Sequence, residues 1–527
     1  MPDSELIRRI QTRAFFLWRE RTGKQWWDST SNWLEAQQIE KGLASPIGFE
    51  QSQDHRVTEV YRFRSMDALL GPRAELEDQY IYLSSPPELN DPMEGYKDVF
   101  WRGDPVLWEN LLRHYLLALL CSTAQCQLMD DASFEEPRIA ATLCEDDLPT
   151  AAFRNIYQDC CDRFFASGAM SSVPGRLSAL ACPLHTHGLK LILSLLHLGA
   201  FGCVAASMQR AGLVPAGWGE QPTSAATDEL VELIDALGRS SREIEQGELE
   251  KLAFAFNQVQ EQEAVRCTFG FGSEASTIDT KKKVHLLFSF PHAYVRAISD
   301  TLIHPEWYVA CFSEHCDDAS MWANYADQHR GAALIYRVEH DAAGRPYLPL
   351  SVVTGCTSSR ADPTPRFLKG PARALLHPVS YTNKAPEIDF FQCLAMLPRQ
   401  QIVQRWHSST AGVRSSLPIE MLDDEAGWRK RLWNSFNTMA TTKLRDWSHE
   451  REHRIVLPDG LGMLKEDRKA EYNLSHLSGV VFGLRTSMTD RLAMIKVLQR
   501  KCEAAGRSDF KFYQMSYHPT EGRLIRL

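Results

Sequence analysis

The sequence lacks the motifs of the most familiar nucleotide-binding and metal-binding sites. It has no Gly-x-x-x-x-Gly-Lys, and no Gly-x-Gly-x-x-Gly follows an expected strand, which argues against a phosphate-loop ATPase and a Rossmann dinucleotide site. It has no Cys-x-x-Cys either, and its 13 cysteines are scattered and odd in number. Because the first residues are charged and resemble no secretory signal, we expect a cytoplasmic protein whose thiols are mostly buried and free.

A strong positive charge is also missing. The formal net charge is −9 and no long basic run stands out, so nothing indicates tight binding of nucleic acid through its phosphates. One apolar stretch, 189–208, is barely long enough to span a bilayer, and it carries Lys190 near its start. We therefore expect a buried helix or helix pair there and no membrane segment.

What the chain does have is length and an ordinary globular composition. Its 527 residues, 44% hydrophobic and 24% charged, suffice for roughly three domain-sized units or for one core with a large insertion. Hydrophobic spacing predicts a mostly helical segment, with its clearest helices at 111–120, 151–165, 189–208 and 228–256. Further along it predicts a strand, a helix and a strand at 307–312, 320–328 and 332–338.

The stretch with the most chemical potential is 443–457. It contains two glutamates, two histidines and three arginines, and it ends in an apolar run, Ile455-Val456-Leu457, that is typical of a strand. The turn sequence Pro458-Asp459-Gly460 follows. Two different chemistries fit these residues, and each requires a different backbone.

The first interpretation is a Glu-x-Glu pair, Glu450 and Glu452, at the entry to a strand. Residues i and i+2 of a strand share a face, so both carboxylates would point into one cleft. Two close carboxylates push their pKa values apart, which separates an acid–base role from an electrostatic one. The plain alternative is that both glutamates are solvated charges paired with neighbouring arginines.

The second interpretation is a zinc site, because His449-Glu450-Arg451-Glu452-His453 satisfies His-Glu-x-x-His. That string needs a helix, since only the i, i+4 spacing turns His449 and His453 toward one metal ion. The strand residues that follow leave His453 at best on the last turn of such a helix. A third ligand should follow downstream, but no recognisable motif supplies one.

Several short motifs in a fixed order resemble one bacterial family. They are Tyr61-Arg62-Phe63-Arg64-Ser65, Ile81-Tyr82-Leu83-Ser84-Ser85-Pro86, Asn90-Asp91-Pro92-Met93-Glu94, Cys311-Phe312-Ser313-Glu314, Met321-Trp322-Ala323-Asn324-Tyr325-Ala326, His329-Arg330-Gly331, Trp447-x-x-Glu450-x-Glu452-x-Arg454 and Val480-Val481-Phe482-Gly483. In this order they look like the family catalogued as domain of unknown function 2971, whose members are often found near phage-defence and mobile-element genes. The resemblance covers about 57–100 and 300–527.

The order of these motifs is also similar to the core of ADP-ribosyltransferases, and that similarity implies a function. In those enzymes a first strand carries an Arg or His that holds NAD, a second strand carries a Ser or Tyr on the nicotinamide side, and a later strand carries the catalytic Glu. Carried over to this sequence, the resemblance implies NAD contacts from Tyr61, Arg62, Tyr82 and Ser84, and catalytic carboxylates at Glu452 and Glu450.

We therefore expect an α+β fold, in which a split mixed β-sheet core resembling an ADP-ribosyltransferase is interrupted by a large helical insertion. The expected segments are an N-terminal helical extension at 1–56, core parts at 57–100 and 301–527, and the helical insertion at 101–300.

The expected function is that of an NAD-dependent ADP-ribosyltransferase or NAD glycohydrolase, acting as a phage-defence effector or toxin on a protein or nucleic-acid acceptor. Two alternatives stay open. One is a zinc-dependent hydrolase at His449, Glu450 and His453. The other is a non-enzymatic sensor or scaffold whose helical insertion binds a protein partner.

Overall fold

The computed structural model describes residues 56–129, 134–214, 231–232, 234–235, 246–268, 279–357, 366–417, 419–460 and 462–527. They form two compact units. Unit 1 takes in the described residues up to Tyr96, then Glu306–Pro386 and Trp433–Leu527, and unit 2 takes in Lys97–Pro305 and Glu387–Leu432. The fold is mixed α+β, as the sequence predicts. The expected N-terminal extension lies outside the described residues, apart from Arg56.

Unit 1 is built on a mixed eight-stranded sheet with the order β10-β14-β5-β1-β6-β16-β17-β18. Its strands are β1 (Glu59–Arg64), β5 (Glu306–Ser313), β6 (Ala332–Arg337), β10 (His377–Pro378), β14 (Glu452–Asp459), β16 (Leu477–Phe482), β17 (Lys511–His518) and β18 (Arg523–Arg526). All neighbours are antiparallel except β16 and β17. The strand nearest β1 on one side is therefore β5, and β5 in turn pairs with β14.

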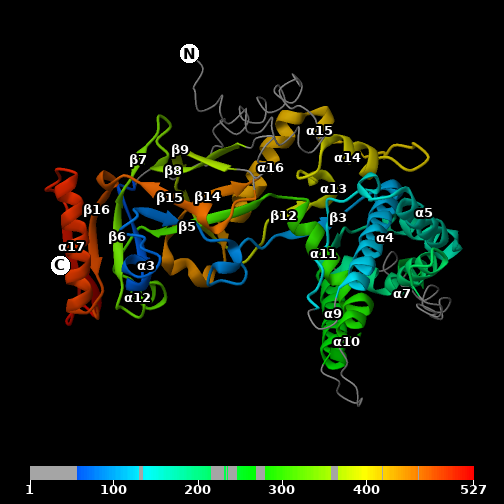
Figure 1. Cartoon of the computed structure of the whole chain (residues 1–527), viewed down its shortest axis with the longest axis horizontal. Coiled ribbons are helices and arrows are strands. Elements are labelled where there is room, and N and C mark those ends of the chain that lie inside the picture. Colours follow the sequence, from blue (N-terminus) through cyan, green and yellow to red (C-terminus); the bar gives the residue numbers. More distant parts are fainter. Residues whose placement is uncertain are drawn as a thin grey trace. The chain divides into compact units, whose positions relative to one another are not determined.

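The two faces of this sheet bury different cores, because successive strand residues point to opposite sides. One face carries Val60, Phe312 and Val480, and helix α17 (Met488–Ala504) packs on it through Met494 and Leu498. Figure 1 shows α17 running alongside β16. The other face carries Tyr61, Phe63, Ala333 and Val481 and is covered by helix α12 (Ala319–Tyr325), whose Met321 and Trp322 are buried against it.

Smaller elements complete unit 1. A second sheet has the order β2-β15-β8-β7, with β9 also paired to β8, and a short parallel pair joins β11 to β13. Their bounds are β2 (Tyr80–Tyr82), β7 (Glu339–His340), β8 (Pro346–Thr357), β9 (Arg366–Leu375), β11 (Ser380–Tyr381), β13 (Thr442–Lys443) and β15 (Lys469–Tyr472). The short helices are α3 (Met66–Leu70), η2 (Pro86–Glu88), η7 (Arg445–Glu450), η8 (Lys465–Arg468) and η9 (Leu474–His476).

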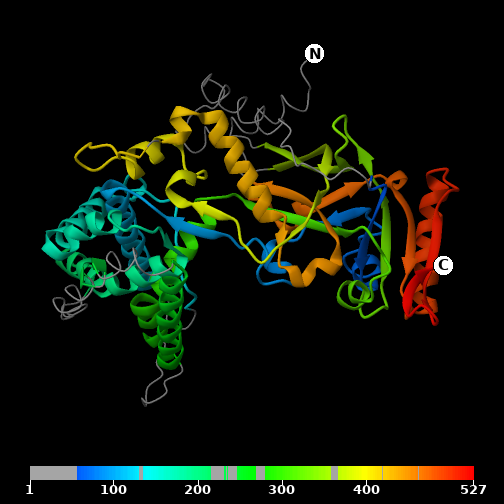
Figure 2. The ribbon, with the colours of Figure 1, turned by 180° about the vertical axis from the view of Figure 1, so that it is seen from behind.

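Unit 2 is mainly helical, with one three-stranded sheet of order β12-β3-β4. Helices α4 (Pro105–Leu128), α5 (Ala151–Ala166) and α7 (Thr186–Arg210) share one large apolar core. Figure 2 shows the ribbon of these helices gathered together. The other elements are β3 (Asp98–Trp101), η4 (Glu145–Asp147), α6 (Gly168–Ser178), β4 (Leu184–His185), α9 (Gln246–Thr268), α10 (Asp279–Val284), the π-helical turn η5 (His285–Ser289), α11 (Phe290–Thr301), β12 (Glu387–Asp389), α13 (Phe390–Cys393), α14 (Arg399–Gln401), the π-helical turn η6 (Ile402–Trp406) and α15 (Glu420–Asp423). Helix α16 (Glu425–Ala440) begins in unit 2, and its residues from Trp433 on belong to unit 1.

The apolar stretch 189–208 lies within α7. Among the described residues, α7 is the one helix long and apolar enough to cross a membrane, with a mean hydropathy of 1.9 over 18 residues. By length and composition alone, a single helix of this kind is weak evidence for a membrane span. Since 61% of that window is buried within the protein, α7 has the character of a core helix, as in a soluble protein.

Most of the predicted elements are present. The helices expected at 111–120, 151–165 and 189–208 lie within or closely match α4, α5 and α7, and the expected strand, helix and strand correspond to β5, α12 and β6. The helix expected at 228–256 falls partly on residues outside the described part; its last residues, from Gln246 on, lie within α9. The cysteines in the described part are free thiols. The expectation that they are mostly buried is wrong, because five of these twelve are buried and seven are partly exposed.

Candidate functional site: a buried charge cluster in unit 1

The Glu-x-Glu stretch does not form a single strand. Residues Arg445–Glu450 form the 3-10 helix η7, and β14 begins only at Glu452. Between them Arg451 adopts a left-handed backbone with φ of 45°, a conformation that costs a non-glycine residue about 1 kcal/mol or more and here ends the helix. The prediction that both glutamates lie on one strand is therefore wrong for Glu450.

Both carboxylates nevertheless reach the same place. The side chains of Glu450 and Glu452 are only 2% and 4% exposed. The ammonium of Lys443 lies 2.7 Å from Glu450 Oε2 and 3.6 Å from Glu452 Oε2. A third carboxylate, Glu94, lies 3.4 Å from the same ammonium, and its side chain is 2% exposed. These residues lie in a water-poor interior, where charge interactions are strong.

Arg454 completes what we call the charge cluster: Glu94, Lys443, Glu450, Glu452 and Arg454. Its guanidinium donates from Nε and Nη2 to the two carboxylate oxygens of Glu452, each at 2.9 Å. The same group donates to Glu94 at 2.7 and 2.8 Å and to the Ala440 carbonyl at 2.9 Å. Arg454 is fully buried. Paired bonds of this kind are the strongest geometry available to an arginine and a carboxylate.

The cluster sets the protonation of its members. Burial alone would raise the pKa of Glu452, but the positive charges of Arg454 and Lys443 outweigh it and hold that pKa below its usual value. The Tyr325 hydroxyl donates to Glu450 Oε1 at 2.7 Å, and burial together with the Glu450 charge raises the pKa of that tyrosine. Glu452 is thus an ionised carboxylate at neutral pH. The neighbouring carboxylate, Glu450, accepts a hydrogen bond from the neutral phenol of Tyr325.

Three strands contribute one row of side chains beside this cluster. Ser313 on β5 is the direct partner of Tyr61 on β1 and of Glu452 on β14. Directly opposite residues of paired strands point to the same face, so Tyr61, Ser313 and Glu452 share one side of the sheet. The Ser313 hydroxyl donates to the Glu450 carbonyl at 2.8 Å, which ties the end of η7 to β5.

The structure does not bring Arg62 to this row. Arg62 follows Tyr61 on β1 and therefore points to the opposite face, where it is buried. Its guanidinium donates to the Tyr82 carbonyl at 2.8 Å and to the Cys311 carbonyl at 3.3 Å and lies 5.6 Å from the Phe312 ring centre. Arg62 thus holds strands together within the core.

Tyr82 and Ser84 also lie apart from the row. Tyr82 ends β2, a strand of the second sheet, and its hydroxyl lies 3.4 Å from Glu88 Oε1. Ser84 forms a single antiparallel bridge with Val309 of β5. The strand beside β1 that carries a serine is β5, with Ser313. Ser313 belongs to the motif Cys311-Phe312-Ser313-Glu314, and the resemblance gave it no role. Tyr61 is the member of the predicted NAD-contact set that lies in the row with Glu452. Ser84, opposite Val309, faces the same side of β5 but lies four residues away from Ser313 along that strand.

The backbone does not provide what the zinc interpretation needs. His449 lies in η7 and His453 on β14, so the five residues do not form one α-helix. His453 points away from Glu452 by strand alternation, and its Nδ1 lies 3.5 Å from Glu314 Oε1. In the part of the chain that the structure describes, no group of three or more His, Cys, Asp or Glu side chains is placed to hold a metal ion.

The family motifs of the sequence converge on this cluster. Glu94, Ser313, Tyr325, Glu450, Glu452 and Arg454 come from four separate motifs, and all of them lie in or against it. Lys443 lies outside those motifs, and only its place in the charged stretch could have indicated it. Comparison with protein family models, curated proteins and solved structures finds no match. The resemblance to the family of unknown function stays a prediction.

Proposed function

We propose that unit 1 is an ADP-ribosyltransferase-like enzyme that cleaves NAD, with Glu452 as its catalytic carboxylate. The observation that carries this proposal is the cross-strand row of Tyr61, Ser313 and Glu452 beside the charge cluster. The row provides two of the three residue types that the resemblance assigns to such a site: a serine on a strand next to the first one, and a glutamate at the start of a late strand. On the first strand the row has Tyr61, because Arg62 faces the other side of the sheet. The resemblance itself supplies the bacterial, cytoplasmic and phage-defence setting of this proposal.

The proposed reaction breaks the bond between nicotinamide and ribose. Nicotinamide leaves with the electron pair of that bond, and positive oxocarbenium-like charge develops on the ribose. An ionised carboxylate at Glu452 stabilises this charge, and Glu450 orients or deprotonates the acceptor, which is water or a nucleophile on a protein or nucleic acid. Because Glu452 is bridged to Arg454 in the structure, the reaction also requires Arg454 to release one oxygen of Glu452 when NAD binds.

The test is nicotinamide release from NAD by the full chain, with and without bacterial lysate as a source of acceptors. Glu452→Gln keeps the size of the side chain and removes its charge, so we expect kcat to fall by about 10²–10³-fold. Glu503→Gln, on the exposed side of α17, is the matched control and should release nicotinamide at the wild-type rate. Thermal unfolding of each variant shows whether it is folded.

A second candidate is a non-enzymatic sensor or scaffold, favoured by the pairing of every charged group in the cluster. In that case Glu452, Glu94 and Arg454 fix the strand ends and take part in no chemistry. Release of nicotinamide by the wild type and its loss in folded Glu452→Gln would rule this candidate out. Full release by Glu452→Gln would remove Glu452 from catalysis, and no release by the wild type under either condition would favour the scaffold.

A further inference from the structure

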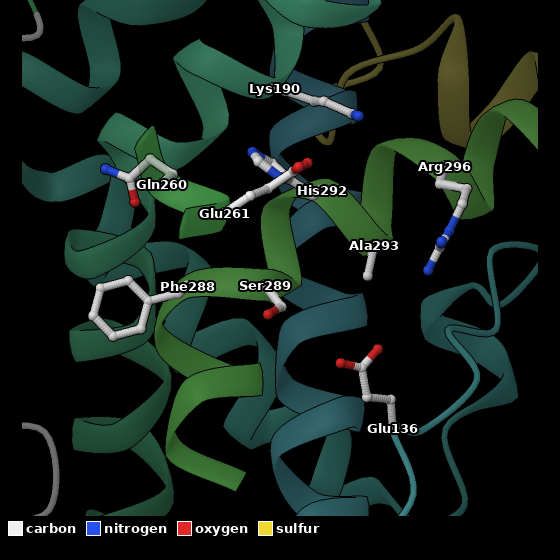
Figure 3. Close-up of a pocket in the computed structure, with 9 residues that line it drawn as sticks. All are labelled: Glu136, Lys190, Gln260, Glu261, Phe288, Ser289, His292, Ala293 and Arg296. Carbon is white, nitrogen blue, oxygen red and sulfur yellow. The ribbon is translucent and has the colours of Figure 1, made fainter. Parts of the chain in front are cut away.

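Unit 2 contains a pocket between its helices. It has a volume of about 250 Å³. Its lining comes from the segment before η4 and from α7, α9, η5 and α11, and consists of Glu136, Lys190, Gln260, Glu261, Phe288, Ser289, His292, Ala293 and Arg296. Figure 3 shows Glu261 beside His292 near the centre, with Lys190 above them, Arg296 to one side and Glu136 below. Two cations and two carboxylates thus surround one small space.

Near the centre of the pocket two hydrogen-bond acceptors face each other, one on the His292 ring and one on the Glu261 carboxylate. Asn257 donates from Nδ2 to the His187 carbonyl at 3.1 Å, which turns its Oδ1 toward His292 Nε2 at 3.2 Å. Nε2 therefore carries the imidazole proton. Burial lowers the pKa of His292, and the charge of Lys190 adds to this effect. The charge of Glu261, and the hydrogen bond that a protonated ring would donate to it, act in the opposite direction but do not outweigh burial, so the ring is neutral at neutral pH.

The remaining nitrogen of that ring, Nδ1, then has only a lone pair, and it lies 3.4 Å from Glu261 Oε1. A lone pair and a carboxylate oxygen at this separation lack a proton between them. Both are satisfied when a donor with several hydrogens enters the pocket. An ammonium group, with three donors and a positive charge, meets the requirement of the imidazole and of the carboxylate together.

The positive charges of the lining are Lys190, which lies above Glu261 and His292 in Figure 3, and Arg296, which lies to one side. Among the residues that the structure describes, neither Lys190 nor Arg296 forms a hydrogen bond or an ion pair. Burial lowers the pKa of Lys190, and the positive charge of Arg296 acts in the same direction, against the attraction of Glu261. An anionic group placed between Lys190 and Arg296 would relieve this repulsion.

One wall of the pocket is an irregular piece of helix. The π-helical turn His285–Ser289 supplies Phe288 and Ser289, and it interrupts the otherwise α-helical run from α10 into α11. Such single π-helical turns are rare and are found most often at functional sites. Phe288 gives the pocket an apolar surface, and the Ser289 hydroxyl adds a polar one.

We propose that this pocket binds a small zwitterion of the amino-acid class, with its ammonium at Glu261 and His292 and its carboxylate at Lys190 and Arg296. The lining carries two positive and two negative groups, so a ligand with one charge of each sign matches it better than an anion or a cation alone. The volume of about 250 Å³ suits a ligand of single amino-acid size. This site is independent of the function proposed for unit 1.

Isothermal titration of the full chain tests the proposal. The probes are the common amino acids singly, together with glutarate and inorganic phosphate, which lack an ammonium, and 1,4-diaminobutane, which lacks a carboxylate. We expect at least one amino acid to bind with a stoichiometry of one and the other probes to bind at least tenfold more weakly. Lys190→Met and Glu261→Gln should each weaken that amino acid at least tenfold. Lys281→Met, exposed on α10, is the control and should bind as the wild type does.

Three outcomes would overturn the proposal. Binding of no amino acid removes the ligand class. Equal binding of glutarate or phosphate, unchanged in Glu261→Gln, makes the pocket an anion site. Unchanged amino-acid binding in Lys190→Met, with circular dichroism showing the wild-type fold, places any bound zwitterion elsewhere.

Discussion

Replacing Arg454 by methionine is expected to destabilise unit 1 by about 3–5 kcal/mol, because breaking a buried ion pair leaves charges uncompensated in the interior. Arg454 is fully buried and holds both Glu94 and Glu452. Without it three buried carboxylates face Lys443 alone. Methionine keeps an unbranched side chain in the same space, so the loss of stability comes mainly from charge.

Denaturant unfolding measures this effect, and a second substitution identifies its cause. Adding Glu452→Gln to Arg454→Met removes one uncompensated carboxylate, so the double variant should be more stable than Arg454→Met. Arg523→Met removes an exposed arginine and should stay within about 0.5 kcal/mol of the wild type. A fully stable Arg454→Met would show that the carboxylates reach water or bind protons at no cost, and that the cluster does not hold the fold.

The cluster has three carboxylates and two cations, and this excess of one carboxylate makes Glu452→Gln a fair test of catalysis. Removing one of three carboxylates leaves Arg454 bonded to Glu94 and Lys443 bonded to Glu450. The remaining charges are then balanced, two against two, whereas the wild-type cluster has one excess negative charge. A loss of nicotinamide release in this variant can therefore be assigned to Glu452 and not to a collapse of the cluster.

The sequence predicted that Glu450 and Glu452 lie close together, but it did not predict the backbone that carries them. The strand was expected from Ile455, but it begins at Glu452, since the paired partner on β5 continues to Ser313. Local patterns could not choose between the helix that zinc requires and the strand that Glu-x-Glu requires. Arg451, whose backbone is left-handed, ends the helix before His453. Arginine has no preference for that conformation, so the sequence could not predict it.

The sequence could not predict which residues meet in the charge cluster, because those contacts join parts of the chain that are far apart. Glu94 meets Arg454 across 360 residues, and hydrophobic periodicity carries no information on such a pair. The order of motifs carried some information on this pair, because it placed Glu94 and Arg454 in the same expected core. It also placed Arg62 beside Glu452, and there strand alternation overrules the carry-over: the neighbouring residue, Tyr61, faces the cluster.

The prediction that 301–527 forms one part of the core is wrong for Glu387–Leu432, which belong to unit 2. The reason is again a set of long-range contacts. These residues are close in sequence to the Glu-x-Glu stretch, yet β12 pairs with β3, and Phe390, Phe391 and Trp406 are buried in the helical core. The Trp428 indole donates to the Gln392 carbonyl at 2.8 Å. Membership of a unit depends on these tertiary contacts, which neither composition nor a charge pattern reveals.

Mild acid is expected to unfold unit 2, because three of its histidines are buried as neutral rings. Burial lowers the pKa of His114 and of His197 to about 4 and that of His304 to about 3. In the unfolded chain each would have a pKa of about 6.5. The unfolded chain thus binds protons more tightly, so stability is full above pH 6.5 and falls as the pH drops toward 4. At pH 5 each histidine costs about 2 kcal/mol, and about 6 kcal/mol together is comparable with the whole stability of a domain.

Hydrogen exchange of the α4 and α7 amides between pH 8 and 5, corrected for intrinsic rates, reports on this loss because these helices carry His114 and His197. His197→Gln removes one titrating ring, and glutamine can keep a bond to the Tyr115 hydroxyl or to the Leu286 carbonyl, which His197 contacts at 2.7 and 2.5 Å. Its pH dependence should be about one third shallower than that of the wild type. His315→Gln, at a residue of unit 1 whose side chain is 44% exposed, should leave the pH dependence of these amides unchanged. Protection that stays constant down to pH 5 would mean that these rings accept protons within the folded core, and that unit 2 relaxes around them without unfolding.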